Sequence, residues 1–133
     1  MPDAIQPAED VGYVLCDDLI FTSRITGTAQ ALGIKLRPAR SAETLRTLVL
    51  QQPPRCVIVD LGNPGLKLAE LVEFLRLNCP AMPRVVAYGS HVDADGLHAA
   101  RAAGCDPVLP RSKFVEELPR ALPEWIVGIS PRQ

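Results

Sequence analysis

Three aspartates follow apolar segments of the chain and carry the clearest chemical signal in the sequence. Asp60 follows the apolar run 56–59, and Asp17 and Asp18 follow the apolar run 11–16. Carboxylates that lie close together cannot all stay ionised unless a positive charge compensates them. A hard cation such as Mg²⁺, held by carboxylates and waters, supplies that charge at sites that bind phosphate. The alternative for Asp60 is a simple turn residue, because Asp often follows a strand for that reason alone.

Five short segments rich in apolar residues alternate with segments of helical periodicity, which places these aspartates in a repeated strand–helix pattern. The expected strands are 11–16, 34–37, 56–59, 84–88 and 107–110. Such alternation with short connections favours parallel strands, right-handed crossovers and helices on both faces. The expected fold is an α/β, doubly wound, five-stranded parallel sheet in the order 2-1-3-4-5. The first and third strands are then neighbours at the switch point, so the three aspartates should converge at one crevice.

Residues near the ends of the periodic segments predict where the helices begin and end. Ser41 and Asp93 are expected to cap the second and fourth helices through their side-chain oxygens. The fifth helix is expected over 112–118. Pro119 and Pro123 leave its continuation open, because a proline inside a helix costs on the order of 3 kcal/mol.

Composition narrows the classes of function. The chain has 133 residues, a net charge of −1 and a pI near 6.1, so a dedicated nucleic-acid surface is not expected. No apolar stretch approaches the roughly 20 residues that span a bilayer, and no signal peptide is evident, so a cytoplasmic location without membrane contact is expected. Residues 1–10 are expected to form a flexible leader, 11–127 one domain and 128–133 a tail.

The sequence lacks several common ligand-binding patterns. The loop after the first expected strand carries Asp17 and Asp18 in place of a glycine-rich turn, and their charges would repel a pyrophosphate or a flavin phosphate. No Walker-type Gly-Lys-Ser/Thr loop is present. The four cysteines form no Cys-x-x-Cys pair, so we expect them to be free, apolar residues and not zinc ligands.

Together, the aspartates and their neighbours resemble a known family. The segments 14–18, 57–61 with Pro64-Gly65, and 103–106 are similar to the receiver domain of two-component response regulators, the CheY-like family with a flavodoxin-like fold. The resemblance extends over about 11–122, which is nearly the whole chain.

The resemblance implies specific roles for the acidic residues. Asp60 would be the phosphoacceptor, attacking the phosphohistidine of a histidine kinase or a phosphotransfer protein. Asp18 would bind Mg²⁺ directly, Asp17 mostly through water, and the backbone carbonyl of Gly62 would complete the protein ligands. The metal would offset charge on the transferring phosphoryl group.

The sequence departs from the family pattern at three positions. Receivers usually carry Thr or Ser at the end of the fourth strand, where this chain has Gly89, with Ser90 one residue later as a substitute hydroxyl. Receivers usually carry Lys at the end of the fifth strand, where this chain has Arg111. Arg is not a neutral replacement, because its planar fork can clamp a carboxylate with two hydrogen bonds. The usual aromatic residue of the fifth strand is Val108 here.

These observations predict a stand-alone receiver domain without a fused output domain. It would catalyse at most its own phosphorylation and dephosphorylation, and it would signal through a protein partner on the face of the fourth and fifth helices and the fifth strand. The alternatives are a degenerate receiver that binds partners without phosphoryl chemistry and a small phosphatase-like enzyme. Whether the protein forms a homodimer, and whether Trp125 anchors the tail or meets a partner, are left open by the sequence.

Overall fold

A parallel sheet forms the centre of the molecule in the computed structural model, which describes residues 10–128. The strands are β1 (Val11–Leu15), β2 (Lys35–Ala39), β3 (Cys56–Asp60), β4 (Arg84–Gly89) and β5 (Val108–Pro110). The helices are α1 (Leu19–Ala31), α2 (Ala42–Gln51), α3 (Leu68–Asn78), α4 (Ala94–Ala102) and α5 (Arg111–Val127). The sheet order is β2-β1-β3-β4-β5 and every pairing is parallel, which confirms the predicted fold.

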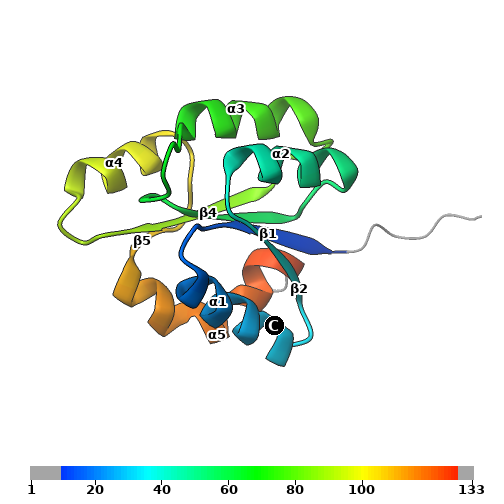
Figure 1. The fold of residues 1–133 in the computed structure, drawn as a ribbon, viewed down its shortest axis with the longest axis horizontal. Coiled ribbons are helices and arrows are strands. Elements are labelled where there is room, and N and C mark those ends of the chain that lie inside the picture. Colours follow the sequence, from blue (N-terminus) through cyan, green and yellow to red (C-terminus); the bar gives the residue numbers. More distant parts are fainter. Residues whose placement is uncertain (1–9, 129–133) are drawn as a thin grey trace, which may run out of the picture.

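Helices cover both faces of the sheet. Figure 1 shows α1 and α5 on one face and α2, α3 and α4 on the other. Each face buries its own apolar cluster, so the central strands are apolar on both sides, as expected for a parallel sheet. All five residues of β3 are buried, and they include Asp60 at its carboxyl end. The burial of the strand on both faces fixes the position of this carboxylate.

The caps predicted from the sequence are confirmed. The Ser41 side chain accepts a hydrogen bond from the Thr44 backbone N–H at 3.1 Å, and the Asp93 side chain accepts one from Gly96 at 3.0 Å. Each cap satisfies a backbone donor that has no partner inside the helix. The sequence did not identify a third cap, in which Asp18 begins α1.

The fifth helix is longer than the sequence predicted. It begins at Arg111 and continues through Pro119 and Pro123 to Val127. Pro119 is exposed and Pro123 is only partly buried, and the two lie four residues apart on one side of the helix. The adjoining side buries six residues, and this packing outweighs the lost hydrogen bonds. Those six residues are Phe114, Leu118, Ala121, Leu122, Trp125 and Ile126. Trp125 therefore anchors α5 against the sheet.

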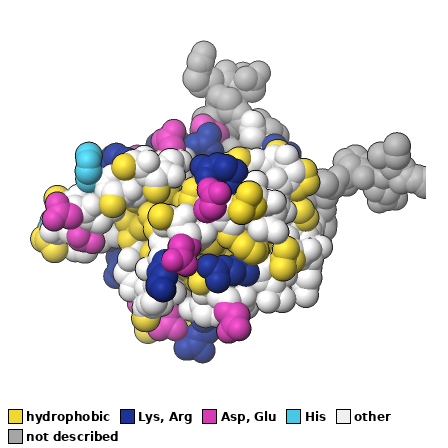
Figure 2. All heavy atoms as spheres, turned by 90° about the horizontal axis from the view of Figure 1, so that it is seen from above, with side chains coloured by type: hydrophobic (Ala, Val, Ile, Leu, Met, Phe, Trp, Pro, Cys, Tyr) yellow, Lys and Arg dark blue, Asp and Glu magenta, His cyan; other side chains and the backbone are white. Residues whose placement is uncertain are grey.

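The surface agrees with the near-neutral composition. Figure 2 shows acidic and basic side chains side by side on the face formed by α2, α3 and α4. Within residues 10–128 no helix is long and apolar enough to cross a membrane. All four cysteines are free and buried, and burial raises the pKa of Cys56 to about 12 and that of Cys105 to about 11. These thiols are therefore protonated at neutral pH, as expected for apolar core residues.

The expected leader and tail fall mostly outside the described residues. Asp10 is the described end of the leader, and its carboxylate pairs with Arg55 at 3.1 Å. Gly128 ends α5 in the left-handed conformation that favours glycine.

Candidate functional site

Asp60 lies at the carboxyl end of β3, between β1 and β4 in the sheet. Its side chain is only 7 % exposed, and its Oδ1 accepts a hydrogen bond from the Gly62 backbone N–H at 2.8 Å. Its Oδ2 faces the Cys16 thiol at 3.6 Å and an Arg111 guanidinium nitrogen at 3.9 Å. One carboxylate oxygen is thus fixed by the backbone, and the other lies beside a cation.

The other two aspartates lie at the same sheet edge, but their side chains contact different groups. The Asp17 carboxylate lies 3.6 Å from the guanidinium of Arg40, and both side chains are about half exposed. The Asp18 carboxylate accepts the α1 cap hydrogen bond from the Phe21 N–H at 3.0 Å. A neighbouring arginine and a helix cap thus each contact one of these carboxylates, and the convergence of all three on one metal ion stays a prediction.

The fit to Mg²⁺ follows from this arrangement. Carboxylate and carbonyl oxygens are suitable ligands for a hard cation, so the donor types are right. Among residues 10–128, however, no three His, Cys, Asp or Glu side chains are close enough together to hold a metal ion. As the side chains lie, they do not form a ready three-carboxylate Mg²⁺ site: the Asp17 carboxylate lies beside Arg40, and the Asp18 carboxylate caps α1 with Oδ1, which leaves Oδ2 as its second oxygen. The metal roles of Asp17, Asp18 and Gly62 stay predictions.

Arg111 is the cation that the structure brings to Asp60. Its guanidinium also lies over two aromatic rings, 5.1 Å from the ring centre of Phe21 and 5.9 Å from that of Tyr88. Stacking of this kind suits the flat guanidinium better than a lysine ammonium. Lys113 does not share this role, because its ammonium lies within 4 Å of Glu116 and Glu117 on α5.

Neither Gly89 nor the hydroxyl candidate Ser90 at the end of β4 forms a side-chain hydrogen bond with Asp60 within residues 10–128. Ser90 is exposed, and its Oγ accepts a hydrogen bond from the Val92 N–H at 3.3 Å within its own loop. At Gly89, an added Cβ would lie 3.3 Å from both Cβ and Cδ1 of Leu61. Leu61 therefore packs against the position where a Thr or Ser side chain would begin. A hydroxyl at residue 89 would require Leu61 to shift by a few tenths of an ångström.

Cys16 and Tyr88 border the site and were not assigned to it from the sequence. Cys16 follows β1, which pairs with β3 so that Leu15 lies beside Val59; the next residues along are Cys16 and Asp60. Tyr88 is the registered partner of Asp60 on β4 and is fully buried. Burial raises the pKa of the Tyr88 phenol far above its usual value, and Cys16 and the Asp60 carboxylate raise it further. Strand register was the signal that could have found both residues.

The Tyr88 hydroxyl provides the first testable prediction. This oxygen is buried and has no hydrogen-bond partner at good geometry within residues 10–128. Tyr88→Phe is therefore expected to raise the free energy of unfolding by about 1 kcal/mol, because an unsatisfied buried polar group costs about 1–3 kcal/mol. Urea denaturation followed by circular dichroism measures the change.

Tyr13→Phe is the matched control for this prediction. The hydroxyl of Tyr13 lies 3.1 Å from the carbonyl oxygen of Leu48 and 2.7 Å from that of Gln52. Its removal is expected to lower the free energy of unfolding by about 1 kcal/mol. Equal losses of stability in both variants would mean that the Tyr88 hydroxyl has a hydrogen-bond partner, and the prediction would be wrong.

Comparison with known proteins gives matches at the level of structure. No protein-family model and no curated protein sequence matches this chain. A solved structure of NtrX from Brucella abortus is 17% identical, with a TM-score of 0.76 over 90% of this chain and 27% of the NtrX chain. The chain therefore spans about a quarter of NtrX.

Two further similar structures match over nearly their whole length. One belongs to the co-crystal of the Saccharomyces cerevisiae histidine phosphotransfer signalling protein Ypd1 with the receiver domain of the response regulator Ssk1. It is 16% identical with a TM-score of 0.74, covering 90% of each chain. The other is a response regulator receiver protein from Burkholderia phymatum, 23% identical with a TM-score of 0.71, covering 92% of this chain and 98% of that one.

The topology and the acidic carboxyl edge define a doubly wound α/β domain of the flavodoxin-like type. The similar structures define its fold more narrowly. The chain has the fold of response regulator receiver domains, as its sequence predicted.

Proposed function

We propose that this chain is a receiver-type signalling domain that accepts a phosphoryl group on Asp60 from a phosphohistidine. The observation that carries the proposal is the geometry of the Asp60 carboxylate, with Oδ1 held by the Gly62 amide and Oδ2 beside Arg111. Oδ2 attacks phosphorus, the phosphorus–nitrogen bond of the donor breaks, and the donor imidazole keeps the electron pair and takes up a proton. The product is an aspartyl phosphate.

Arg111 supports this chemistry electrostatically. A guanidinium can donate two parallel hydrogen bonds to phosphoryl oxygens, and it stays charged at every relevant pH. Its stacking on Phe21 and Tyr88 holds it near Oδ2 before the donor arrives. Arg111 is thus suited to the place where the family pattern has Lys.

Acetyl phosphate tests the proposal directly. The protein is incubated with acetyl phosphate, with and without Mg²⁺, and its intact mass is measured. We expect the mass of one phosphoryl group to be added, with acetate as the other product. The prediction that Asp17, Asp18 and Gly62 help to bind Mg²⁺ requires this gain to depend on the metal. No gain under either condition contradicts phosphorylation of Asp60.

The proposal includes a phosphodonor protein that docks beside the site. The similar receiver domain of Ssk1 was crystallised with a phosphotransfer protein. In this chain the first turn of α1, next to Asp17 and Asp18, exposes two large apolar side chains: Leu19 is 59% exposed and Ile20 is 86% exposed. We propose that a histidine kinase or phosphotransfer protein covers them, because an apolar protein surface gains free energy when it is buried.

Ile20→Ser is expected to slow phosphoryl transfer from the partner protein roughly tenfold, because burying an isoleucine side chain contributes about 1.5–3 kcal/mol. Phosphorylation by acetyl phosphate should stay unchanged, because Asp60 and Arg111 are untouched. Stopped-flow or quench measurements with both donors give the comparison. Leu77→Ser is the control, since Leu77 is 72% exposed on α3, on the other side of the sheet. Equal slowing by both variants contradicts docking at α1.

The downstream part of the proposal concerns the face formed by α4, β5 and α5, where an output partner would bind. We expect the protein to act in the cytoplasm, without direct contact with nucleic acid or membrane, and to turn over no separate substrate. Because Leu61 packs against the position of the usual hydroxyl, phosphorylation is expected to move this face only weakly.

A second candidate is a receiver-like module that binds partners without phosphoryl chemistry. Two observations favour it: Asp17 and Asp18 are contacted by other groups, and no hydroxyl in the described part of the chain forms a hydrogen bond with Asp60. Such a module binds its partner equally well with Asp60→Asn and without Mg²⁺. A partner affinity that rises on treatment with acetyl phosphate contradicts this candidate.

A further inference from the structure

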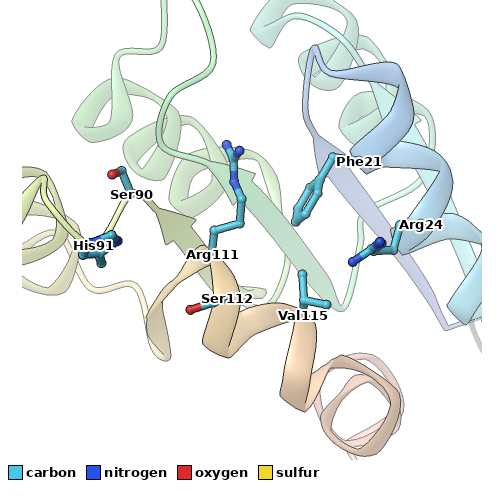
Figure 3. Close-up of a pocket in the computed structure, with 7 residues that line it drawn as sticks. All are labelled: Phe21, Arg24, Ser90, His91, Arg111, Ser112 and Val115. Carbon is cyan, nitrogen blue, oxygen red and sulfur yellow. The ribbon is translucent and has the colours of Figure 1, made fainter.

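A groove opens beside Asp60 between two helices and the loop that follows β4. Its volume is about 580 Å³, within the range of roughly 300–1,000 Å³ that is usual for small-molecule sites. Phe21 and Arg24 enter it from α1, and Arg111 and Val115 enter it from α5 (Figure 3). The remaining lining residues are Ser90, His91 and Ser112. We call this pocket the arginine groove.

The arginine groove is positively charged on a protein whose net charge is −1. Two of its lining residues, Arg24 and Arg111, are permanently charged, and no carboxylate from the described part of the chain lines it. Arg24 forms no ion pair within residues 10–128. Arg111 pairs, among the described residues, only with Asp60, at 3.9 Å. Both guanidinium groups can therefore bind an anion without first breaking a short ion pair.

The first turn of α5 borders the same groove through Arg111 and Ser112. The N-cap of this 17-residue helix is Pro110, which makes no side-chain cap hydrogen bond. The first backbone N–H groups of a helix have no partner inside it, and the helix dipole makes this end positive. Ser112, in the first turn, also lines the groove and brings a hydroxyl donor. Helix amides, a hydroxyl and two arginines together are a donor set suited to phosphate.

The rest of the groove is apolar. Phe21 is partly buried and packs its ring against Tyr88, with 5.1 Å between ring centres, and Val115 lies across from it on α5. Apolar walls beside a small number of charged groups are typical of sites that bind a small organic anion. A flat ring can stack on the phenylalanine or on a guanidinium plane.

We propose that the arginine groove binds a nucleoside monophosphate. The phosphate lies between Arg24 and Arg111 at the start of α5, and the base lies against Phe21 and Val115. This site goes beyond the proposed phosphorylation of Asp60, because none of its binding groups is the phosphoacceptor. The two sites share Arg111, so a bound phosphate draws its guanidinium away from Asp60 and slows phosphorylation by acetyl phosphate.

The experiment is an NMR titration of the full ¹⁵N-labelled chain with AMP and, separately, with CMP. Adenosine and inorganic phosphate are further probes that carry only the ring or only the anion. We expect saturable amide shifts around Phe21, Ser90 and Ser112 with a monophosphate, and affinity for each partial probe weaker by roughly tenfold or more. The absence of saturable shifts in the groove with both AMP and CMP overturns the proposal, and so does equal affinity for inorganic phosphate.

Arg24→Gln and Arg120→Gln form the matched pair of variants. Arg24 lines the groove, whereas Arg120 is exposed further along α5 and does not. We expect Arg24→Gln to weaken binding of the monophosphate roughly tenfold and Arg120→Gln to leave it unchanged, because a hydrogen bond to a charged group is lost only in the first. Equal affinity of Arg24→Gln and the unchanged chain overturns the assignment.

Asp60→Asn separates this proposal from the phosphorylation of Asp60. The variant cannot be phosphorylated at that residue but keeps every lining residue of the groove. We expect it to bind the monophosphate at least as tightly as the unchanged chain, because Arg111 loses its carboxylate neighbour. Loss of monophosphate binding in this variant contradicts the proposed site in the arginine groove. A failure of acetyl phosphate to label the protein, with nucleotide binding intact, removes only the phosphorylation proposal.

Discussion

Asp60→Asn is expected to lower the rate of phosphoryl incorporation at least roughly a hundredfold, equivalent to about 2.7 kcal/mol in the activation barrier. The amide keeps the shape of the side chain and its hydrogen bond from Gly62, but it has no anionic oxygen to attack phosphorus. Intact-mass measurement after incubation with a phosphohistidine donor gives the rate. Peptide mapping of the unchanged protein should place the label on the peptide that contains Asp60.

Asp95→Asn is the control for the loss of a negative charge. Asp95 is an exposed carboxylate in the first turn of α4, away from Arg111 and Asp60. Its replacement should leave the rate unchanged. Full labelling of Asp60→Asn would show that another group accepts the phosphoryl, and the proposal for Asp60 would then be wrong.

The sequence predicted the parts of the fold that depend on local patterns. The run from Cys56 to Val59 has no polar alternation, and it is a strand buried on both faces. Ser41 precedes a helix with an apolar face, and its side chain caps that helix. The repeated strand–helix alternation then fixes the sheet order, because right-handed crossovers leave few other topologies. The place of Asp60 at the working edge follows from the same rules.

The details of the site depend on neighbours that are distant in sequence, so local patterns did not predict them. The sequence favoured a metal role for Asp18 and gave no sign that its Oδ1 also caps α1, which only the tertiary geometry shows. Gly89 indicated a missing hydroxyl, but the packing of Leu61 against that position depends on how β3 and β4 lie side by side in the folded chain. The length of α5 was underestimated because the cost of a proline can be read from the local sequence. The packing of the helix against the sheet, which offsets that cost, cannot.

A second large effect is expected from the aromatic stack that supports Arg111. Phe114 is fully buried, and its ring centre lies 4.5 Å from that of Tyr88 and 5.9 Å from that of Trp125. Phe114→Ala is expected to lower the free energy of unfolding by about 3–5 kcal/mol, because it removes buried apolar surface and leaves a cavity. That is a large part of the roughly 5–15 kcal/mol that is usual for a domain.

Phe74→Ala is the matched substitution on the other face of the sheet. Phe74 is only partly buried, and its ring contacts the guanidinium of Arg46. Its loss is expected to cost less than half as much, because less surface leaves water and a surface site can relax. Urea denaturation of both variants by circular dichroism gives the comparison, with the fluorescence of Trp125, the single tryptophan, as a second probe. Equal losses would contradict the central role of the Phe114 stack.

Because Tyr88 packs on Phe114 and the guanidinium of Arg111 lies over Tyr88, Phe114→Ala should also slow phosphorylation under conditions where the variant stays folded.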